Sequence, residues 1–172
     1  MDKNNLCFID GQNLYIGTKL EEDPWIIDFK KLRKYLKKKY KIKIAYYYIG
    51  YKSNLNQDIY DKLKNYNYVI VFKNHISSMT SKKKGNIDCD IIFDIMKKIC
   101  EKEVFDKIIL ISGDGDYIKL VDYLIEKNKF EKILFPNRKY ASSLYRKLGG
   151  KYFDYLYKIK SKLIKKQKPP EN

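Results

Sequence analysis

Aspartates follow two short apolar segments whose composition is typical of buried strands. Asp10 comes directly after residues 6–9, and Asp114 and Asp116 follow residues 107–112. The carboxyl ends of parallel strands meet at one edge of a sheet, which is where ligands bind in α/β proteins. Carboxylates brought together there repel one another unless a cation, a hydrogen-bond partner or a proton relieves the charge. The spacing therefore predicts an acidic site at one sheet edge.

Asp88 is expected to join this site from the first turn of a helix predicted over residues 87–101. At about 100° per residue, the isoleucines of this helix cover an arc of about 140°, and Asp88 falls at about 100°, inside that arc. Asp90 and Asp94 fall on a separate polar arc, which makes Asp90 an expected surface residue. A carboxylate in the buried sector of a helix needs a partner, a proton or a cation.

Each aspartate also has a purely structural interpretation. Asp10 and Asp114 could cap turns through hydrogen bonds to nearby amides, and Asp88 could be a first-turn residue that the helix dipole favours. Three such residues at one edge favour a bound Mg²⁺ or Mn²⁺, since these ions prefer carboxylate and water oxygens. A divalent ion there would bridge acids and phosphate and activate a water molecule, which is the chemistry of phosphodiester cleavage.

Cysteine and histidine chemistry has little support in the sequence. The cysteines are Cys7, Cys89 and Cys100, which form no CxxC pair, and His75 is the only histidine. They cannot supply a Cys/His zinc site or a disulfide scaffold. A catalytic triad would depend on His75 alone, which we expect to be an ordinary loop residue.

The charge of the chain favours a polyanionic partner. Its 172 residues include 37 Lys and Arg against 21 Asp and Glu, a net charge of +16, although a lysine-rich genome composition would also produce this excess. Such a field attracts nucleic acid through phosphate contacts. Lys82, Lys83 and Lys84 are nearest in sequence to Asp88 and are expected to hold the polynucleotide backbone.

The remaining patterns predict a single α/β domain. Strands are predicted over residues 6–9, 42–49, 68–72, 107–112 and 132–135, and helices near 14–20 and over 29–39, 56–66, 87–101, 117–126 and 140–148. Their alternation predicts a mostly parallel central sheet with helices on both faces. The lysine-rich segment 158–172 is expected to be a frayed tail. Neither a membrane span nor a signal peptide is expected, which favours a cytoplasmic protein.

Three motifs in this order resemble the NYN domain family, a branch of the PIN-like nucleases. They are FIDGQNL at residues 8–14, KGNIDCDIIFD at 84–94 and SGDGDY at 112–117, and the resemblance covers about residues 4–155. It implies a PIN-like three-layer sandwich, with the domain placed at residues 1–157, and a metal-dependent ribonuclease activity. Asp94 matches the last acid of the second motif, but we consider it a secondary site candidate because it falls on the polar arc of the predicted helix. Tyr117 stands where the family usually has Phe.

The resemblance matches Asp10, Asn13, Asp88, Asp114 and Asp116 to positions of the family motifs, and together with the residue types it leads to a hypothesis for each site residue. Asp10, Asp88 and Asp114 would hold Mg²⁺ or Mn²⁺, and Asp116 would act as a further ligand or as a water-orienting base. Asn13 and Ser112 would position ligands or phosphate. Lys84, with Lys82 and Lys83, would hold the scissile backbone of a single-stranded RNA.

Two other functions compete with this hypothesis. A regulatory module of the same fold could bind RNA through its lysines without cutting it. A phosphotransfer or nucleotide-binding domain fits the fold, but the chain has neither a GxxxxGK[ST] loop nor a GxGxxG segment after its first strand. The sequence leaves monomer and homodimer open.

Overall fold

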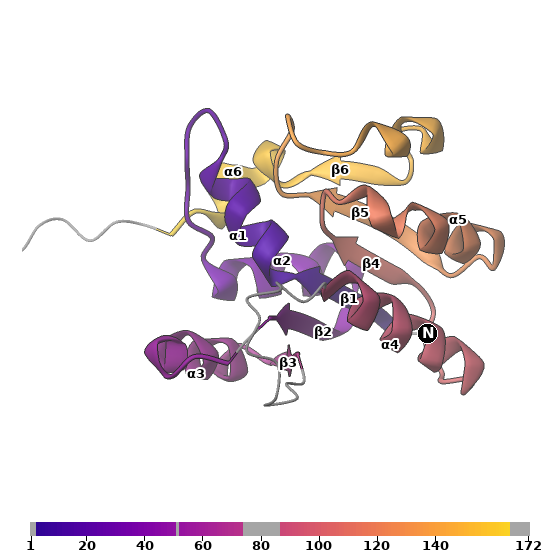
Figure 1. The fold of residues 1–172 in the computed structure, drawn as a ribbon, viewed down its shortest axis with the longest axis horizontal. Helices are drawn as coiled ribbons and strands as arrows, with labels where there is room; N and C mark the ends of the chain where they lie inside the picture. Colours follow the sequence, from indigo (N-terminus) through magenta and orange to yellow (C-terminus); the bar gives the residue numbers. More distant parts are fainter. Residues whose placement is uncertain (1–2, 51, 74–86, 166–172) are drawn as a thin grey trace, which may run out of the picture.

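Six parallel strands form the centre of the computed structural model, which describes residues 3–50, 52–73 and 87–165 (Figure 1). The strands are β1 (Asn5–Asp10), β2 (Ile42–Ile49), β3 (Tyr68–Phe72), β4 (Ile108–Ile111), β5 (Phe130–Phe135) and β6 (Phe153–Tyr155). Their order across the sheet is β3-β2-β1-β4-β5-β6, and every neighbouring pair is parallel. The predicted α/β class is confirmed.

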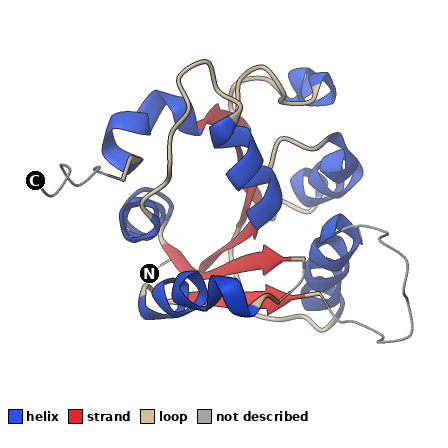
Figure 2. Ribbon diagram, turned by 60° about the vertical axis from the view of Figure 1, so that its left-hand side comes forward, coloured by secondary structure: helices blue, strands red, loops and turns tan. Residues whose placement is uncertain are grey.

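Helices lie on both sides of this sheet (Figure 2). The α-helices are α1 (Gly11–Lys19), α2 (Phe29–Tyr40), α3 (Gln57–Asn65), α4 (Ile87–Cys100), α5 (Ile118–Glu126) and α6 (Lys160–Leu163). Short 3₁₀ turns are η1 (Asn54–Asn56), η2 (Gly115–Tyr117), η3 (Ser143–Leu148) and η4 (Leu156–Ile159). Among the described residues, none of these helices has the length and apolar character needed to cross a membrane.

The alternating side chains of β1 divide the core into two layers. Cys7 and Ile9 pack in one cluster with Leu14 of α1 and residues of α2. Leu6 and Phe8 pack in the other cluster with residues of α4 and α5. Because both faces of the sheet are covered, the central strand is apolar from Leu6 to Ile9, between Asn5 and Asp10.

The chain changes direction across the sheet between β1 and β4. It runs from β1 outward to β2 and β3, and then crosses back through α4 to β4 on the other side of β1. The register pairs Ile9 with Ile111, so the residues after these two positions emerge side by side. Open α/β sheets bind ligands in the crevice outside the carboxyl ends of strands at such a switch point.

One local expectation, the helix over residues 140–148, was wrong, and two further local features were not predicted from sequence. The aromatic segment near residue 153 forms β6, a strand of only three residues that offers too short a pattern to identify from sequence. The helix expected over residues 140–148 is the 3₁₀ turn η3, which begins at Ser143. In α3, Tyr60 and Leu63 form the buried face, whereas Ile59 is 46% exposed.

The C-terminal segment is ordered further than expected. Leu163 is fully buried, and Ile164 forms an antiparallel bridge with Ile27. Lys31 Nζ donates to the Ile164 carbonyl oxygen at 2.7 Å. The prediction of a frayed tail is therefore wrong for residues 158–165, because Leu163 anchors this segment in the core beside α2. Residues 166–172 lie outside the described residues.

Candidate active site

Three aspartate side chains converge at the switch point. One carboxylate oxygen from each of Asp88, Asp114 and Asp116 lies within 4.8 Å of the other two. Asp88 is buried at the start of α4, Asp114 is half-buried after β4, and Asp116 in η2 is exposed. The cluster thus runs from the protein interior to its surface.

Asp10 lies beside this cluster in a more buried position. Its side chain is 5% exposed, and its Oδ1 accepts a hydrogen bond from the Asn13 backbone amide at 2.8 Å, so it also caps α1. Burial raises the pKa of Asp10 to about 6; the Asn13 amide opposes this rise, and the charges of Asp88 and Asp114 add to it. Asp10 therefore feels the charge of the cluster although it lies outside the tight group of three.

A buried tyrosine orients Asp88. The Tyr117 hydroxyl, from η2, donates a hydrogen bond to Asp88 Oδ1. Burial, followed by the charge of Asp10 and the hydrogen bond to Asp88, raises the pKa of Tyr117 well above its ordinary value. The hydroxyl consequently keeps its proton and acts as a donor. The Tyr117 hydroxyl thus makes direct contact with the acidic cluster.

The loop after β4 is held by four further hydrogen bonds. Asp114 Oδ1 accepts from the Asp116 amide at 3.0 Å, and Ser112 Oγ accepts from the Asp114 amide at 3.1 Å. The Gly113 amide donates to Asn13 Oδ1 at 2.8 Å, which ties this loop to the start of α1. The Tyr145 hydroxyl donates to the Asp114 carbonyl oxygen. These bonds fix the direction of the Asp114 side chain.

The alternative interpretation, in which the aspartates cap turns and helices, is therefore also correct for two of them. Asp10 caps α1 and Asp114 caps η2, each through its Oδ1 atom. Ser112 is fully buried, so its hydroxyl acts on the Asp114 loop and does not face the cleft. Asn13 lines the cleft while bracing Gly113.

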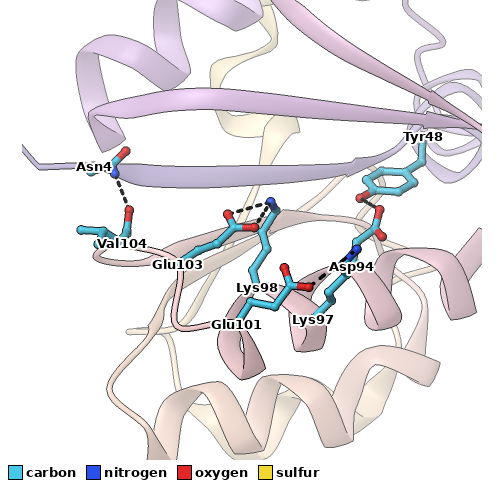
Figure 3. A network of polar contacts seen from close by, with 8 residues as sticks. All are labelled: Asn4, Tyr48, Asp94, Lys97, Lys98, Glu101, Glu103 and Val104. Atoms are coloured by element: carbon cyan, nitrogen blue, oxygen red, sulfur yellow. Dashed lines mark hydrogen bonds and ion pairs between the residues drawn. The ribbon is translucent and has the colours of Figure 1, made fainter.

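The remaining candidates lie elsewhere. Asp94 Oδ2 accepts from the Tyr48 hydroxyl at 2.7 Å, on the side of α4 where Lys98 pairs with Glu103 (Figure 3). Among the described residues, the converging group of aspartates and the lining of the cleft include neither Asp90 nor Asp94. Lys82, Lys83, Lys84 and His75 lie outside the described residues.

A cleft of about 450 Å³ surrounds the acidic cluster. Its lining is Asp10, Gln12, Asn13, Ile16, Gly17, Leu20, Ile87, Asp88, Gly113, Asp114, Asp116, Asn137 and Tyr140. The sequence interpretation missed Asn137, whose Nδ2 donates to the Gly17 carbonyl oxygen at 2.8 Å and whose Oδ1 accepts from the Tyr140 amide. Its position just after β5 could have identified it, because the rule that selected Asp10 applies to every strand end.

The donor set suits a hard divalent cation. Carboxylate oxygens that lie within 4.8 Å of one another can contact one ion at metal–oxygen distances of about 2.0–2.6 Å. The three acids are all oxygen donors, and no cysteine or histidine lines the cleft among the described residues. This chemistry matches Mg²⁺ or Mn²⁺ better than zinc or copper.

The structure is thus an α/β protein with an all-parallel sheet and an acidic cleft at its switch point. The fold is similar to the crystal structure of a protein of unknown function from Vibrio parahaemolyticus, with a TM-score of 0.73 and 19% identity, covering 95% of this chain and 97% of that one. The NYN domain matches residues 6–154, and the chain belongs to the NYN domain family. The family and the PIN-like α/β fold expected from sequence are confirmed.

Two curated relatives are similar in sequence. The low amplitude and bright protein LabA of Synechococcus elongatus is 27% identical over 171 residues, covering 94% of this chain and 88% of LabA. A MATH and LRR domain-containing protein of Plasmodium falciparum is 26% identical over 109 residues, covering 63% of this chain but 1% of that protein.

Proposed function

We propose that the protein is a ribonuclease that hydrolyses phosphodiester bonds of single-stranded RNA with the help of Mg²⁺ or Mn²⁺. The observation that carries this proposal is the convergence of Asp88, Asp114 and Asp116 in a cleft at the switch point. Family membership supports a nuclease-like function, and the net charge of +16 supports a polyanionic substrate.

The acids would divide the work according to their burial. Asp88 and Asp114 would hold the ion. The Tyr117 hydroxyl orients Asp88. Asp114 is oriented by two hydrogen bonds, one from the Asp116 amide to its carboxylate and one from its own amide to Ser112 Oγ. Asp10, coupled to both by charge, would complete the negative site from the interior. Asp116 is exposed at the mouth, where it would hold the ion or orient the attacking water.

A bound divalent ion would lower the pKa of a coordinated water and neutralise charge that develops on the phosphate. The basic surface would then hold the RNA backbone. Lys82, Lys83 and Lys84 precede Asp88 in sequence and remain the proposed contacts to the scissile strand. Asn13 would act on the substrate through the loop it braces at Gly113.

The test compares matched aspartate substitutions in one helix. Asp88→Asn removes a charge from the cluster, whereas Asp90→Asn removes a charge two positions along α4, outside the converging group. Both proteins are incubated with labelled single-stranded RNA and Mn²⁺, and their folding is checked by circular dichroism. We expect Asp88→Asn and Asp114→Asn to abolish cleavage and Asp90→Asn to retain it.

The alternative function has a distinct outcome in the same experiment. A non-catalytic RNA-binding module would retain RNA in a gel shift without metal-dependent shortening in the parent protein. Parent protein that binds several RNA substrates and cleaves none of them would overturn the ribonuclease proposal and favour the binding module.

A further inference from the structure

A second hollow lies on the other side of α1 from the acidic cleft. It has a volume of about 750 Å³, within the range of small-molecule sites. Five aromatic side chains from α1, α2, α3, β2 and the segment before α2 line it. They are Tyr15, Trp25, Phe29, Tyr47 and Tyr60, and we call this hollow the aromatic groove.

The aromatic groove has a rigid floor and an open rim. Trp25, Tyr47 and Tyr60 are almost completely buried, which fixes their rings. Tyr15 is 58% exposed at the rim, and Ile59 of α3 is exposed across from it. Ile59 is therefore an exposed apolar side chain that a ligand in the groove can contact.

The lining of the groove includes the indole of Trp25. Trp25 is 3% exposed, and its Nε1 has no hydrogen-bond partner among the described residues. Because this atom is itself shielded from solvent, it is not available to a ligand in the groove. A nucleobase presents a flat π-face, which suits the aromatic lining of the groove.

A lysine covers one face of the rim tyrosine. Lys19 Nζ lies 4.4 Å from the centroid of the Tyr15 ring, one helical turn along α1. An aromatic face next to an ammonium group matches a nucleotide, whose base stacks while its phosphate meets the charge.

The aromatic groove is continuous with the acidic cleft through the start of α1. Gln12 lines both hollows, and Gly11, which follows Asp10 directly, lines the groove. Both hollows also open at the carboxyl edge of the sheet, because Ile49 and Gly50 at the end of β2 line the groove. A strand crossing the acidic cleft therefore reaches the groove by passing over one turn of α1.

We infer that the aromatic groove binds a nucleobase of the same single-stranded RNA whose backbone is cut in the acidic cleft. This inference rests on the proposed function for its substrate, but it assigns a separate site. Because stacking accepts any base, the groove would anchor the strand with little sequence preference.

The binding test uses the fluorescence of Trp25, the only tryptophan of the chain. The full chain is titrated in EDTA, which prevents metal-dependent cutting, with a short oligouridylate and with an abasic oligonucleotide of equal length. We expect the oligouridylate to quench Trp25 and to bind about fivefold or more tightly than the abasic strand, as loss of one stacked base predicts.

Two pairs of variants locate the effect. Tyr15→Ala removes the exposed ring beside Lys19, and its matched control is Tyr123→Ala on α5, whose ring lies 5.4 Å from Lys127 in the same relation along the helix. Ile59→Glu adds a negative charge in the groove, and Leu55→Glu adds one at a 96% exposed position that does not line it. We expect the two groove variants to weaken oligouridylate binding about fivefold or more, and the controls to bind as the parent does.

Equal binding of the two oligonucleotides, or parent-like binding by Tyr15→Ala and Ile59→Glu, would overturn the inference. The failure of each proposal is distinguishable. Base-dependent quenching without any cleavage would support the groove and overturn the ribonuclease. Cleavage that depends on Asp88 without any base-dependent quenching would overturn the groove alone.

Discussion

The surroundings of Asp10 act in opposite directions on the ionisation of its carboxyl group. As the N-cap of α1 it accepts the Asn13 amide, which favours the carboxylate. Burial and the neighbouring charges of Asp88 and Asp114 disfavour the carboxylate and raise its pKa to about 6. At neutral pH the metal-free protein therefore holds an ionised group at a position that disfavours ionisation.

This conflict predicts that Asp10→Asn stabilises the metal-free protein. The folded protein holds the Asp10 proton more tightly than the unfolded chain, whose ordinary pKa is 3.8. Proton binding by Asp10 therefore stabilises the folded protein. This stabilisation is fully present below about pH 4 and is lost as the pH rises through about 6. Asn keeps the cap without the charge, so the variant should gain on the order of 1–3 kcal/mol in unfolding free energy at about pH 7. Urea unfolding in EDTA at several pH values measures this gain.

A matched substitution controls for the cap itself. Asp28→Asn makes the same change at the N-cap of α2, where Lys31 Nζ lies 3.9 Å from the carboxylate. No comparable gain is expected there. An Asp10→Asn variant that is less stable than the parent at about pH 7 would contradict the assignment of a disfavoured charge to Asp10.

The hydroxyl of Tyr117 is predicted to stabilise the buried carboxylate of Asp88. Tyr117→Phe keeps the fully buried ring but removes the donor, which leaves Asp88 with one hydrogen bond fewer. Losing a donor to a buried charged acceptor costs about 1–3 kcal/mol. Tyr48→Phe removes the donor to the half-buried Asp94 and should cost less, because solvent can replace it. Thermal unfolding of both metal-free variants checks this order; an equal or reversed order would contradict it.

At the scale of the elements, the junction of β1 and α1 positions both hollows. A Cβ atom on Gly11 would lie 2.5 Å from the Tyr47 ring and 2.5 Å from the Tyr48 carbonyl oxygen. Only glycine therefore lets α1 begin immediately after Asp10 while β2 stays packed against it. The short connection aims Asp10 at the cleft and places Gln12 between the cleft and the groove.

Gly11→Ala is predicted to destabilise the protein by about 1–3 kcal/mol, since the contact with backbone forces the strand and helix apart. Gly150→Ala is the control, because a Cβ atom there meets no atom within 4 Å. It should change stability by less than about 0.5 kcal/mol. Denaturant unfolding compares the two, and a Gly11→Ala variant as stable as Gly150→Ala would refute the tight junction.

The elements that could be predicted from sequence are those with long or strongly apolar patterns. The isoleucine arc of α4 predicted the burial of Asp88, because 14 residues define a helical face clearly. The three residues of β6 and the anchor at Leu163 could not be predicted, because each depends on contacts with distant parts of the chain.

Within the site, sequence patterns identified the acids but not their partners. Asp88, Asp114 and Asp116 were all named as candidates, and the structure brings their oxygens together. The hydroxyl contact of Tyr117 and the bracing role of Asn13 depend on side-chain directions that no spacing rule supplies.

At the scale of the whole molecule, an acidic cleft sits in a chain with a net charge of +16. The surrounding positive field would draw in a polyanion, while the local negative charge would retain a cation. Binding of single-stranded RNA should therefore weaken with salt, with the logarithm of the binding constant falling by about 0.7 per neutralised phosphate for each tenfold rise in salt. Fluorescence titrations in EDTA at several salt concentrations measure this slope. A slope near zero would mean that the lysines do not hold the backbone.

The most direct test of the account is a crystal structure of the parent protein grown with Mn²⁺, with data collected at the manganese absorption edge. We expect an anomalous peak between the carboxylates of Asp88, Asp114 and Asp116, at about 2.0–2.6 Å from their oxygens. The peak should be lost in Asp114→Asn crystals. A cleft without a peak at saturating Mn²⁺, with the three carboxylates bound to lysines or turned apart, would contradict the proposal that this cluster holds a metal ion.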